Sequence, residues 1–164
     1  LLPVLGINTA IISIIAQNHG AQFFERVKET YFTSIKYGLF IMSISGVIIF
    51  LSADIIPTFF SSNLEVINYG SKYLKISAFI IPAYPIFFLS NGFFMALKKS
   101  EIAMLNNIIR NVLLPISVFY LARNIKADFN TFFWIWAILN WTVSLSLFLY
   151  VNYFIKNLIK KKII

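Results

Sequence analysis

The sequence of 164 residues contains no cysteine and a single histidine. Without cysteine it can form neither a disulfide framework nor a thiolate metal site, and it has no cysteine nucleophile. His19 has no second histidine or carboxylate at a ligand spacing such as i, i+4, so we interpret it as an interfacial residue rather than a metal ligand or general base. A glycine-rich phosphate loop is also missing. The sequence therefore predicts no enzyme, no metal site and no bound cofactor.

Charge is scarce as well. Only 12% of the residues are charged, against roughly 25% in a soluble domain, while 59% are hydrophobic and the mean hydropathy is +0.80. Such a surface needs a bilayer as its solvent, and a transmembrane helix needs about 20 mostly apolar residues. Five segments meet or approach this length: residues 1–17, 37–60, 76–97, 102–121 and 132–155. None alternates like a barrel strand, so the predicted fold is all-α, a polytopic membrane bundle of five transmembrane helices.

The basic residues are unevenly distributed between the connections. The net charge is +8, from 14 Lys and Arg against 6 Asp and Glu. Five spans put successive connections on alternating sides, and one side collects nine basic residues: Arg26, Lys28, Lys36, Lys98, Lys99, Lys156, Lys160, Lys161 and Lys162. The other side collects Lys72, Lys75, Arg123 and Lys126. Because basic loops stay in the cytoplasm, we expect a multi-pass protein of the plasma membrane with a cytoplasmic C-terminus and no nucleic-acid partner.

Two segments outside the predicted spans have a composition typical of the membrane surface. The tail of Lys160, Lys161 and Lys162 is either a contact with anionic lipid or a topology anchor. In residues 20–36 the apolar side chains recur every three or four positions. That pattern predicts an amphipathic helix on the inner interface that connects the first two spans.

Arg110 is the clearest ionisable residue within a predicted span. A charge at a helix centre costs about 2.5–3.5 kcal/mol on insertion scales, so it usually faces the bundle interior or a water-filled cavity. Asn106, Asn107 and Asn111 extend the polar sector around it. Two interpretations stay open. Arg110 either snorkels or hydrogen-bonds neighbouring helices and so holds the bundle together, or it lines a transport cavity.

Polar residues and prolines also interrupt the other spans. The candidates for a substrate cavity or a gate are Asn8, Gln17, Tyr84, Asn91, Asn107, Arg110, Asn111 and Asn140. Pro82 and Pro85 in the third span and Pro115 in the fourth each remove a helical hydrogen bond, which predicts bends that act as hinges or shape the bundle passively. No carboxylate lies deep in a predicted span. A proton or sodium relay therefore cannot be assembled from these residues alone.

A series of motifs points to a known family. Residues 16–21 (Ala-Gln-Asn-His-Gly-Ala) and 24–29 (Phe-Glu-Arg-Val-Lys-Glu) resemble the signature that ends the second helix of each half of the multidrug and toxic compound extrusion (MATE) transporters. Residues 57–66 and 70–76 look like the loop before the fourth helix of the half. Residues 91–98, and Arg110 with Pro115, are similar to the next helix pair. The series keeps its order over nearly the whole chain.

The resemblance implies a particular architecture and activity. Members have twelve helices in two lobes and export cationic or amphipathic compounds by alternating access, in exchange for H⁺ or Na⁺. Residues 1–164 would be the C-terminal lobe lacking its first helix, helices 8 to 12, and the initial Leu1 fits a fragment. Some members carry a coupling carboxylate in this lobe's fourth helix, but residues 76–97 have none. The coupling site would then lie in the N-terminal lobe, the expected partner besides the lipid bilayer and the small-molecule substrates.

Two other functions stay open at the level of the sequence. A flippase for lipid-linked saccharides, from the same superfamily, would be expected to carry several basic residues for anionic headgroups, and only Arg110 is available in the spans. A non-transporting membrane scaffold or an integral membrane enzyme belongs to a different class. Loss of a complex or of a reaction, with transport unchanged, on replacing Arg110 and Asn107 would favour that class.

Overall fold

The computed structural model describes residues 1–163, with side chains up to residue 160. Within this range the chain is helical almost throughout and contains no strand, which confirms the predicted all-α class. In chain order the elements are α1 (Leu2–Gly20), α2 (Phe24–Ser52), the 3₁₀ turn η1 (Ile56–Phe59), α3 (Leu64–Ile80), α4 (Ala83–Ala96), α5 (Ser100–Ile108), the π turn η2 (Ile109–Leu113), α6 (Leu114–Asn124) and α7 (Phe129–Ile163). The side chains of Lys161 and Lys162, and with them part of the predicted lipid contact, lie outside the described residues.

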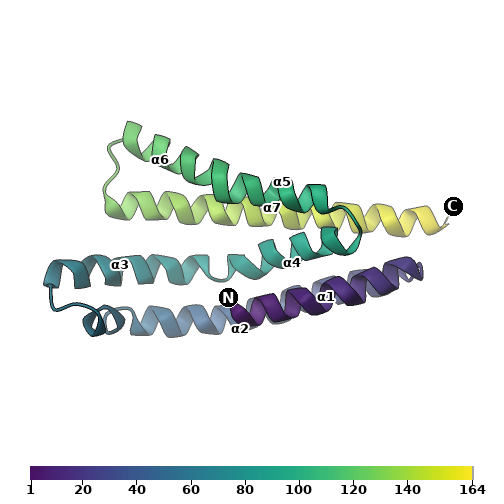
Figure 1. Ribbon diagram of the computed structural model, residues 1–164, viewed down its shortest axis with the longest axis horizontal. Coiled ribbons are helices and arrows are strands. Elements are labelled where there is room, and N and C mark those ends of the chain that lie inside the picture. The colour runs from purple at the N-terminus through teal and green to yellow at the C-terminus, as the bar shows by residue number, and fades with distance from the viewer. Residues whose placement is uncertain (164) are drawn as a thin grey trace.

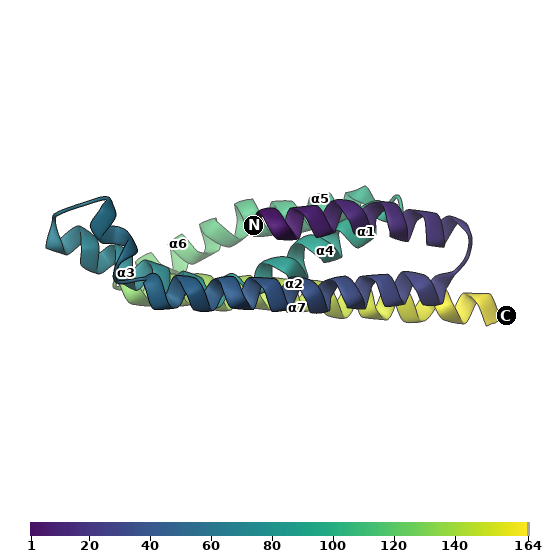
Figure 2. The same ribbon diagram turned by 90° about the horizontal axis from the view of Figure 1, so that it is seen from below.

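Helix α4 is the centre of the bundle. Helices α1, α2, α5 and α7 all pack against it, and it runs between them in Figure 1. Eleven of its 14 residues are buried, as expected for a helix that is apolar on every face. Phe87, Phe93 and Phe94 supply its largest buried side chains. Figure 2 shows α1 and α5 on one side of the molecule and α2 and α7 on the other.

The predicted third span is a bent pair of helices. Helices α3 and α4 meet at 46° around Pro82, which precedes α4, so the predicted bend is confirmed. Residues 61–75 lie outside the predicted spans, but they are helical from Leu64, where α3 begins. The Asn63 side chain accepts a hydrogen bond from the Glu65 N–H at 2.9 Å, and such a cap stabilises a helix start whatever the polarity of the turns that follow.

Helix α2 joins two segments that the sequence analysis kept apart. Residues 20–36 are helical from Phe24, as predicted, but they continue into the second span without a break to give one helix of 29 residues. The helix ends at Ser52 rather than at residue 60, and Pro57 follows in the turn η1. No proline occurs between the two segments, so nothing ends the helix where its composition changes from amphipathic to apolar.

Among the described residues, three helices qualify as membrane spans by length and composition, or four if the bent pair is counted as one span. Helix α2, the run Ser100–Asn124 formed by α5, η2 and α6, and α7 up to Lys160 are long and apolar enough to cross a membrane, and the bent pair α3 and α4 passes as a fourth span. Helix α1, with 19 residues, is not among them. The described residues therefore confirm a multi-pass membrane protein, but not the count of five.

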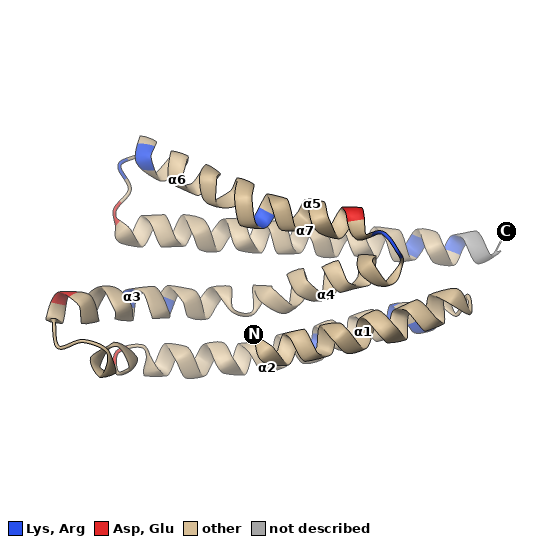
Figure 3. Cartoon of the chain, viewed as in Figure 1, with Lys and Arg blue, Asp and Glu red and all other residues tan. Residues whose placement is uncertain are grey.

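The connections alternate between the two ends of the bundle. The α1–α2 and α4–α5 turns lie at the end where the chain finishes, and the α2–α3 and α6–α7 connections lie at the other (Figure 3). Two positions after the last residue of α1, α4 and α6, the chain has a residue with positive φ. These residues are Gln22 (59°), Lys98 (58°) and Lys126 (50°). In each case the next N–H bonds the carbonyl five residues back, at 2.8–2.9 Å, the pattern of a Schellman motif. This alternation agrees with the predicted sorting of basic residues, while the cytoplasmic side remains a prediction.

Candidate functional site

Arg110 lies in the π turn that precedes Pro115. The Leu114 N–H donates to the carbonyl of Ile109, five residues back, and Pro115 follows with no N–H to donate. The widened turn absorbs the missing hydrogen bond, so Ser100–Asn124 passes as a single span instead of breaking. Such π turns place a side chain where a regular helix would not, and they are frequent at functional sites.

The Arg110 side chain ties three helices together. It is 8% exposed, and its Nε donates to Asn140 Oδ1 on α7 at 3.2 Å. On α4, the guanidinium carbon lies 4.2 Å from the ring centroid of Phe87 and 4.8 Å from that of Tyr84. Asn140 Nδ2 in turn donates to the Trp136 carbonyl at 2.9 Å, which aims its oxygen at Arg110.

This arrangement favours the first interpretation of Arg110. Within the described residues the two ion pairs are Lys28 with Glu25 and Lys75 with Asp54, so no described carboxylate pairs with Arg110. The cation is held by an amide oxygen and by aromatic faces, which attract cations through the ring quadrupole. Tyr84, Arg110 and Asn140, three of the predicted candidates, thus form one cluster that stabilises the packing of α4, η2 and α7.

A second pair of candidates lies where α1 crosses α4. Asn91 is 5% exposed; its Nδ2 donates to the Phe87 carbonyl at 3.1 Å, but its Oδ1 has no donor among the described residues. Asn8 Oδ1 is buried and equally unpaired. It lies so close to Gly92 that a Cβ there would be 2.0 Å from it. An unpaired buried acceptor costs about 1–3 kcal/mol, so both oxygens favour a donor supplied from elsewhere.

The remaining candidate residues lie neither in the Arg110 cluster nor beside Asn8 and Asn91. Gln17 is exposed and its Nε2 reaches only Ser13 Oγ, at 3.4 Å. Asn107 is half-buried with its Nδ2 on the Ala103 carbonyl at 2.8 Å, and Asn111 is exposed. These side chains mark the polar ends and faces of their helices and do not converge on Arg110 or Asn91 in the described residues.

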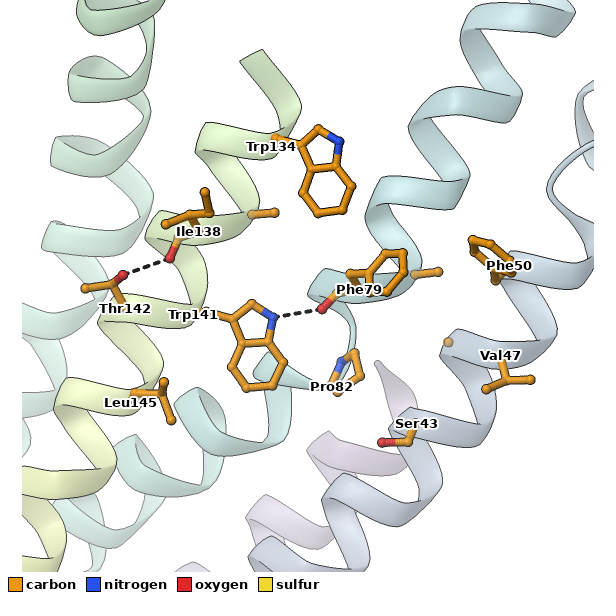
Figure 4. Close-up of a pocket in the computed structure, with 13 residues that line it drawn as sticks. Ser43, Val47, Phe50, Phe79, Pro82, Trp134, Ile138, Trp141, Thr142 and Leu145 are labelled. Atoms are coloured by element: carbon orange, nitrogen blue, oxygen red, sulfur yellow. Dashed lines mark hydrogen bonds between the residues drawn. The ribbon is translucent and has the colours of Figure 1, made fainter. Parts of the chain in front are cut away.

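The structure contains an apolar cavity that the sequence did not predict. It has a volume of about 810 Å³ and opens between α2, the end of α3 and α7 (Figure 4). Trp141 Nε1 donates to the Phe79 carbonyl at 2.8 Å across it. The available signal was the proline at residue 82, which marks the bend between α3 and α4 and lines the cavity. The pairing of Trp141 with Phe79 depends on the register between helices, which a single sequence does not show.

The carboxylates lie at the helix ends. Glu25, Glu29, Asp54, Glu65, Glu101 and Asp128 are all exposed. Hydrogen bonds from Lys75 and then Ser71 hold the pKa of Asp54 below its ordinary value, and Lys75 Nζ lies 2.8 Å from Asp54 Oδ1. The Thr131 hydroxyl and N–H lower the pKa of Asp128 in the same way at the start of α7. Asp54 and Asp128 thus stabilise the segments that connect helices, and neither contacts Asn91 or Arg110.

Long apolar helices define a multi-pass membrane protein, and comparison with known proteins identifies its family. The MatE family model matches residues 1–121, and the chain belongs to that family. The motif resemblance in the sequence is thereby confirmed. No curated protein matches the chain.

Two solved structures share the fold. One is the inward-facing conformation of a multidrug resistance MATE family transporter of the MOP superfamily, with a TM-score of 0.90 and 18% identity, covering 97% of this chain and 37% of that one. The other is a crystal structure of MATE in complex with MaL6, with a TM-score of 0.88 and 18% identity, covering 96% and 36%. The chain thus has the MATE transporter fold and spans a little over a third of the length of these proteins.

Proposed function

We propose that this chain forms the C-terminal lobe, helices 8 to 12, of a secondary transporter that exports cationic or amphipathic small molecules by alternating access in exchange for H⁺ or Na⁺. Membership of the MatE family and the MATE transporter fold support a transporter. The N-terminal lobe would be the partner that completes the substrate path. The protein would lie in the plasma membrane with its C-terminus in the cytoplasm, as the sorting of basic residues favours.

The observation that carries the proposal is the pair of unpaired amide oxygens at the α1–α4 crossing. Asn8 Oδ1 and Asn91 Oδ1 are buried within the apolar bundle and accept no hydrogen bond from the described residues. Amide oxygens carry partial negative charge without a full charge to desolvate, so they attract an ammonium or another donor at a depth where a carboxylate would be costly. An amphipathic cation meets such a site with its polar end and the surrounding apolar side chains with the rest.

Ion coupling would need a group outside the described residues. The six carboxylates of the chain are exposed at helix ends, and the coupling site for H⁺ or Na⁺ is therefore proposed in the N-terminal lobe. A flippase for anionic lipid-linked saccharides is less well supported. Of the described basic residues Arg110 is the single buried one, and its guanidinium is already engaged by Asn140 and by the rings of α4.

Efflux of a fluorescent cation from proteoliposomes that contain the full-length protein tests this proposal. Replacing Asn8 or Asn91 by leucine is expected to reduce efflux about tenfold, the effect of losing one buried hydrogen bond of about 1.4 kcal/mol. Thr9→Val is the matched control, because Thr9 is the exposed neighbour of Asn8 and its hydroxyl already bonds the Leu5 carbonyl at 3.0 Å. Equal efflux from all three variants would exclude the two oxygens from the substrate path, and efflux that persists without either ion gradient would exclude antiport.

A further inference from the structure

The apolar cavity of Figure 4 is a groove with three walls. Helix α2 contributes Val47 and Phe50, the end of α3 and the bend contribute Phe79 and Pro82, and α7 contributes Trp134 and Trp141. Its volume of about 810 Å³ lies in the range of roughly 300–1,000 Å³ that small-molecule sites occupy. No residue of α1, and so neither Asn8 nor its neighbours on that helix, lines the groove.

Two of the polar side chains in the groove wall, those of Trp141 and Thr142, already form hydrogen bonds within the protein. Trp141 Nε1 donates to the Phe79 carbonyl, and Thr142 Oγ1 donates to the Ile138 carbonyl at 2.8 Å. Phe79 packs against Phe50 and Trp134, with ring centroids 5.9 Å and 5.7 Å apart. An occupant of the groove therefore meets aromatic and aliphatic surface, which selects hydrocarbon over a polar ligand.

The length of the groove matches one leaflet of a bilayer. Its wall follows α7 from Trp134 to Leu145, which is about 16 Å at a rise of 1.5 Å per residue. One leaflet contributes half of a hydrocarbon core about 30 Å thick. Since α2 and α7 are both candidate spans and the groove begins near the start of α7, it runs through the leaflet next to the α2–α3 connection.

Basic residues lie at the end of the groove that faces this connection. Lys75 precedes Phe79 by four positions on α3 and so lies on the same helix face, one turn further out. Lys72 lies one turn beyond on that helix, with its Nζ 5.7 Å from the Tyr69 ring. Asp54 balances one of the two lysines, through its contact with Lys75. The rim thus keeps a net positive charge, which complements a phosphate group at the membrane boundary.

We propose that the groove binds one acyl chain of a membrane glycerophospholipid, with the phosphate of that lipid beside Lys75 and Lys72. The acyl chain fills the space between α2 and α7 and packs on Pro82 and Trp141. This site is separate from the substrate path proposed above, and it does not require the Asn8 and Asn91 oxygens to bind a substrate.

Native mass spectrometry of the full-length protein, released from nanodiscs into mild detergent, measures the phospholipid that stays bound. Val47 lines the groove and Ile48 does not, yet both are 58% exposed on the same helix. Val47→Trp fills the groove and is expected to lower the occupancy of the retained phospholipid about tenfold, equivalent to about 1.4 kcal/mol. Ile48→Trp adds the same ring at the same depth and is expected to leave the occupancy unchanged. Equal retention in the two variants would overturn the proposal.

The unmodified protein provides a second measurement that does not depend on a variant folding. A phosphatidylglycerol with a diazirine in the middle of its acyl chain is expected to label residues 43–50 and 134–145 and to survive a wash with unlabelled detergent. Lys72→Gln, which leaves the pair of Lys75 with Asp54 intact, is expected to reduce this labelling about fivefold, from about 1 kcal/mol per lysine near the surface, whereas Lys126→Gln on the α6–α7 turn is not. Labelling that the wash removes, or a cross-link from Val47→Cys to another protein segment in place of lipid, would refute the acyl-chain site.

Discussion

Replacing Asn140 by alanine is expected to leave the Arg110 guanidinium buried without its side-chain hydrogen bond. A hydrogen bond to a charged group contributes about 1.5–3 kcal/mol in a protein interior, whereas hydrogen bonds between membrane helices average about 0.6 kcal/mol and reach about 1.7. Arg110 is 8% exposed and the aromatic contacts persist in the variant. We therefore expect a loss of about 1.5–2 kcal/mol in the free energy of unfolding, at the upper end of the membrane values.

Unfolding of the full-length protein by a denaturing detergent, titrated into mild micelles, measures this loss. Asn111→Ala is the matched control, because Asn111 is the exposed neighbour of Arg110, and its replacement is expected to change the free energy by less than about 0.5 kcal/mol. A double-mutant cycle with Arg110→Met isolates the pair. Removing both partners is expected to cost less than the sum of the single changes, since the double variant contains no uncompensated charge.

The reasoning would be refuted by a coupling energy below about 0.5 kcal/mol in that cycle. Such a result would mean that Arg110 is solvated by water or lipid headgroups in the membrane. The cluster with Tyr84 and Asn140 would then not hold α4, η2 and α7 together. The result would favour the other interpretation, in which Arg110 lines a transport cavity.

Three further changes test other parts of the structure. Gly92→Ala would put a Cβ 2.0 Å from Asn8 Oδ1. The amide of Asn8 must then turn away, so we expect a loss at the lower end of overpacking costs, about 1 kcal/mol. Thermal melting should show most of this loss regained in the double variant with Asn8→Ala, and no rescue would contradict the contact. Lys126 has a positive φ of 50°, a conformation that costs a residue with a side chain about 1–2 kcal/mol. Lys126→Gly removes this strain but adds conformational entropy to the unfolded chain, which costs about 0.5–1 kcal/mol. The melting temperature is therefore expected to rise or stay the same, and a fall would refute the turn geometry. Because the folded pKa of Asp54 is lowered, its ion pair stabilises the protein above the unfolded pKa of about 3.9, and the effect is lost as the pH falls through the folded value. Asp54→Asn should therefore lower the melting temperature more at pH 7 than at pH 3, and an equal difference at both pH values would argue against the pair with Lys75.

The sequence predicted those parts of the fold that depend on local chemistry. The bend at Pro82 followed from the missing N–H of proline, and the helical class followed from long apolar runs. Pro115 shows the limit of the same rule, because the π turn at residues 109–113 absorbs the missing bond and the span continues. The first turns of α3 were left outside the predicted spans because they are polar, although the cap by Asn63 is itself a local signal for a helix start.

The candidate sites depended on information that a single sequence does not contain. Arg110 was identified as the clearest ionisable residue within a predicted span, but its partner Asn140 lies 30 residues away on another helix, and that pairing depends on how α7 is rotated against η2. The contact of Asn8 with Gly92 depends in the same way on the crossing of α1 over α4. Sequence reasoning therefore identified polar residues that belong in a bundle, while their grouping required the packed structure.

The most direct test of the proposed transporter is cation efflux from proteoliposomes containing the full-length protein, measured before and after the H⁺ and Na⁺ gradients are collapsed. Export in exchange for an ion predicts that efflux stops when the coupling gradient is removed, and that Asn91→Leu lowers it about tenfold while Thr9→Val does not. Efflux at an unchanged rate without either gradient, or with Asn91 replaced, would contradict the proposed function.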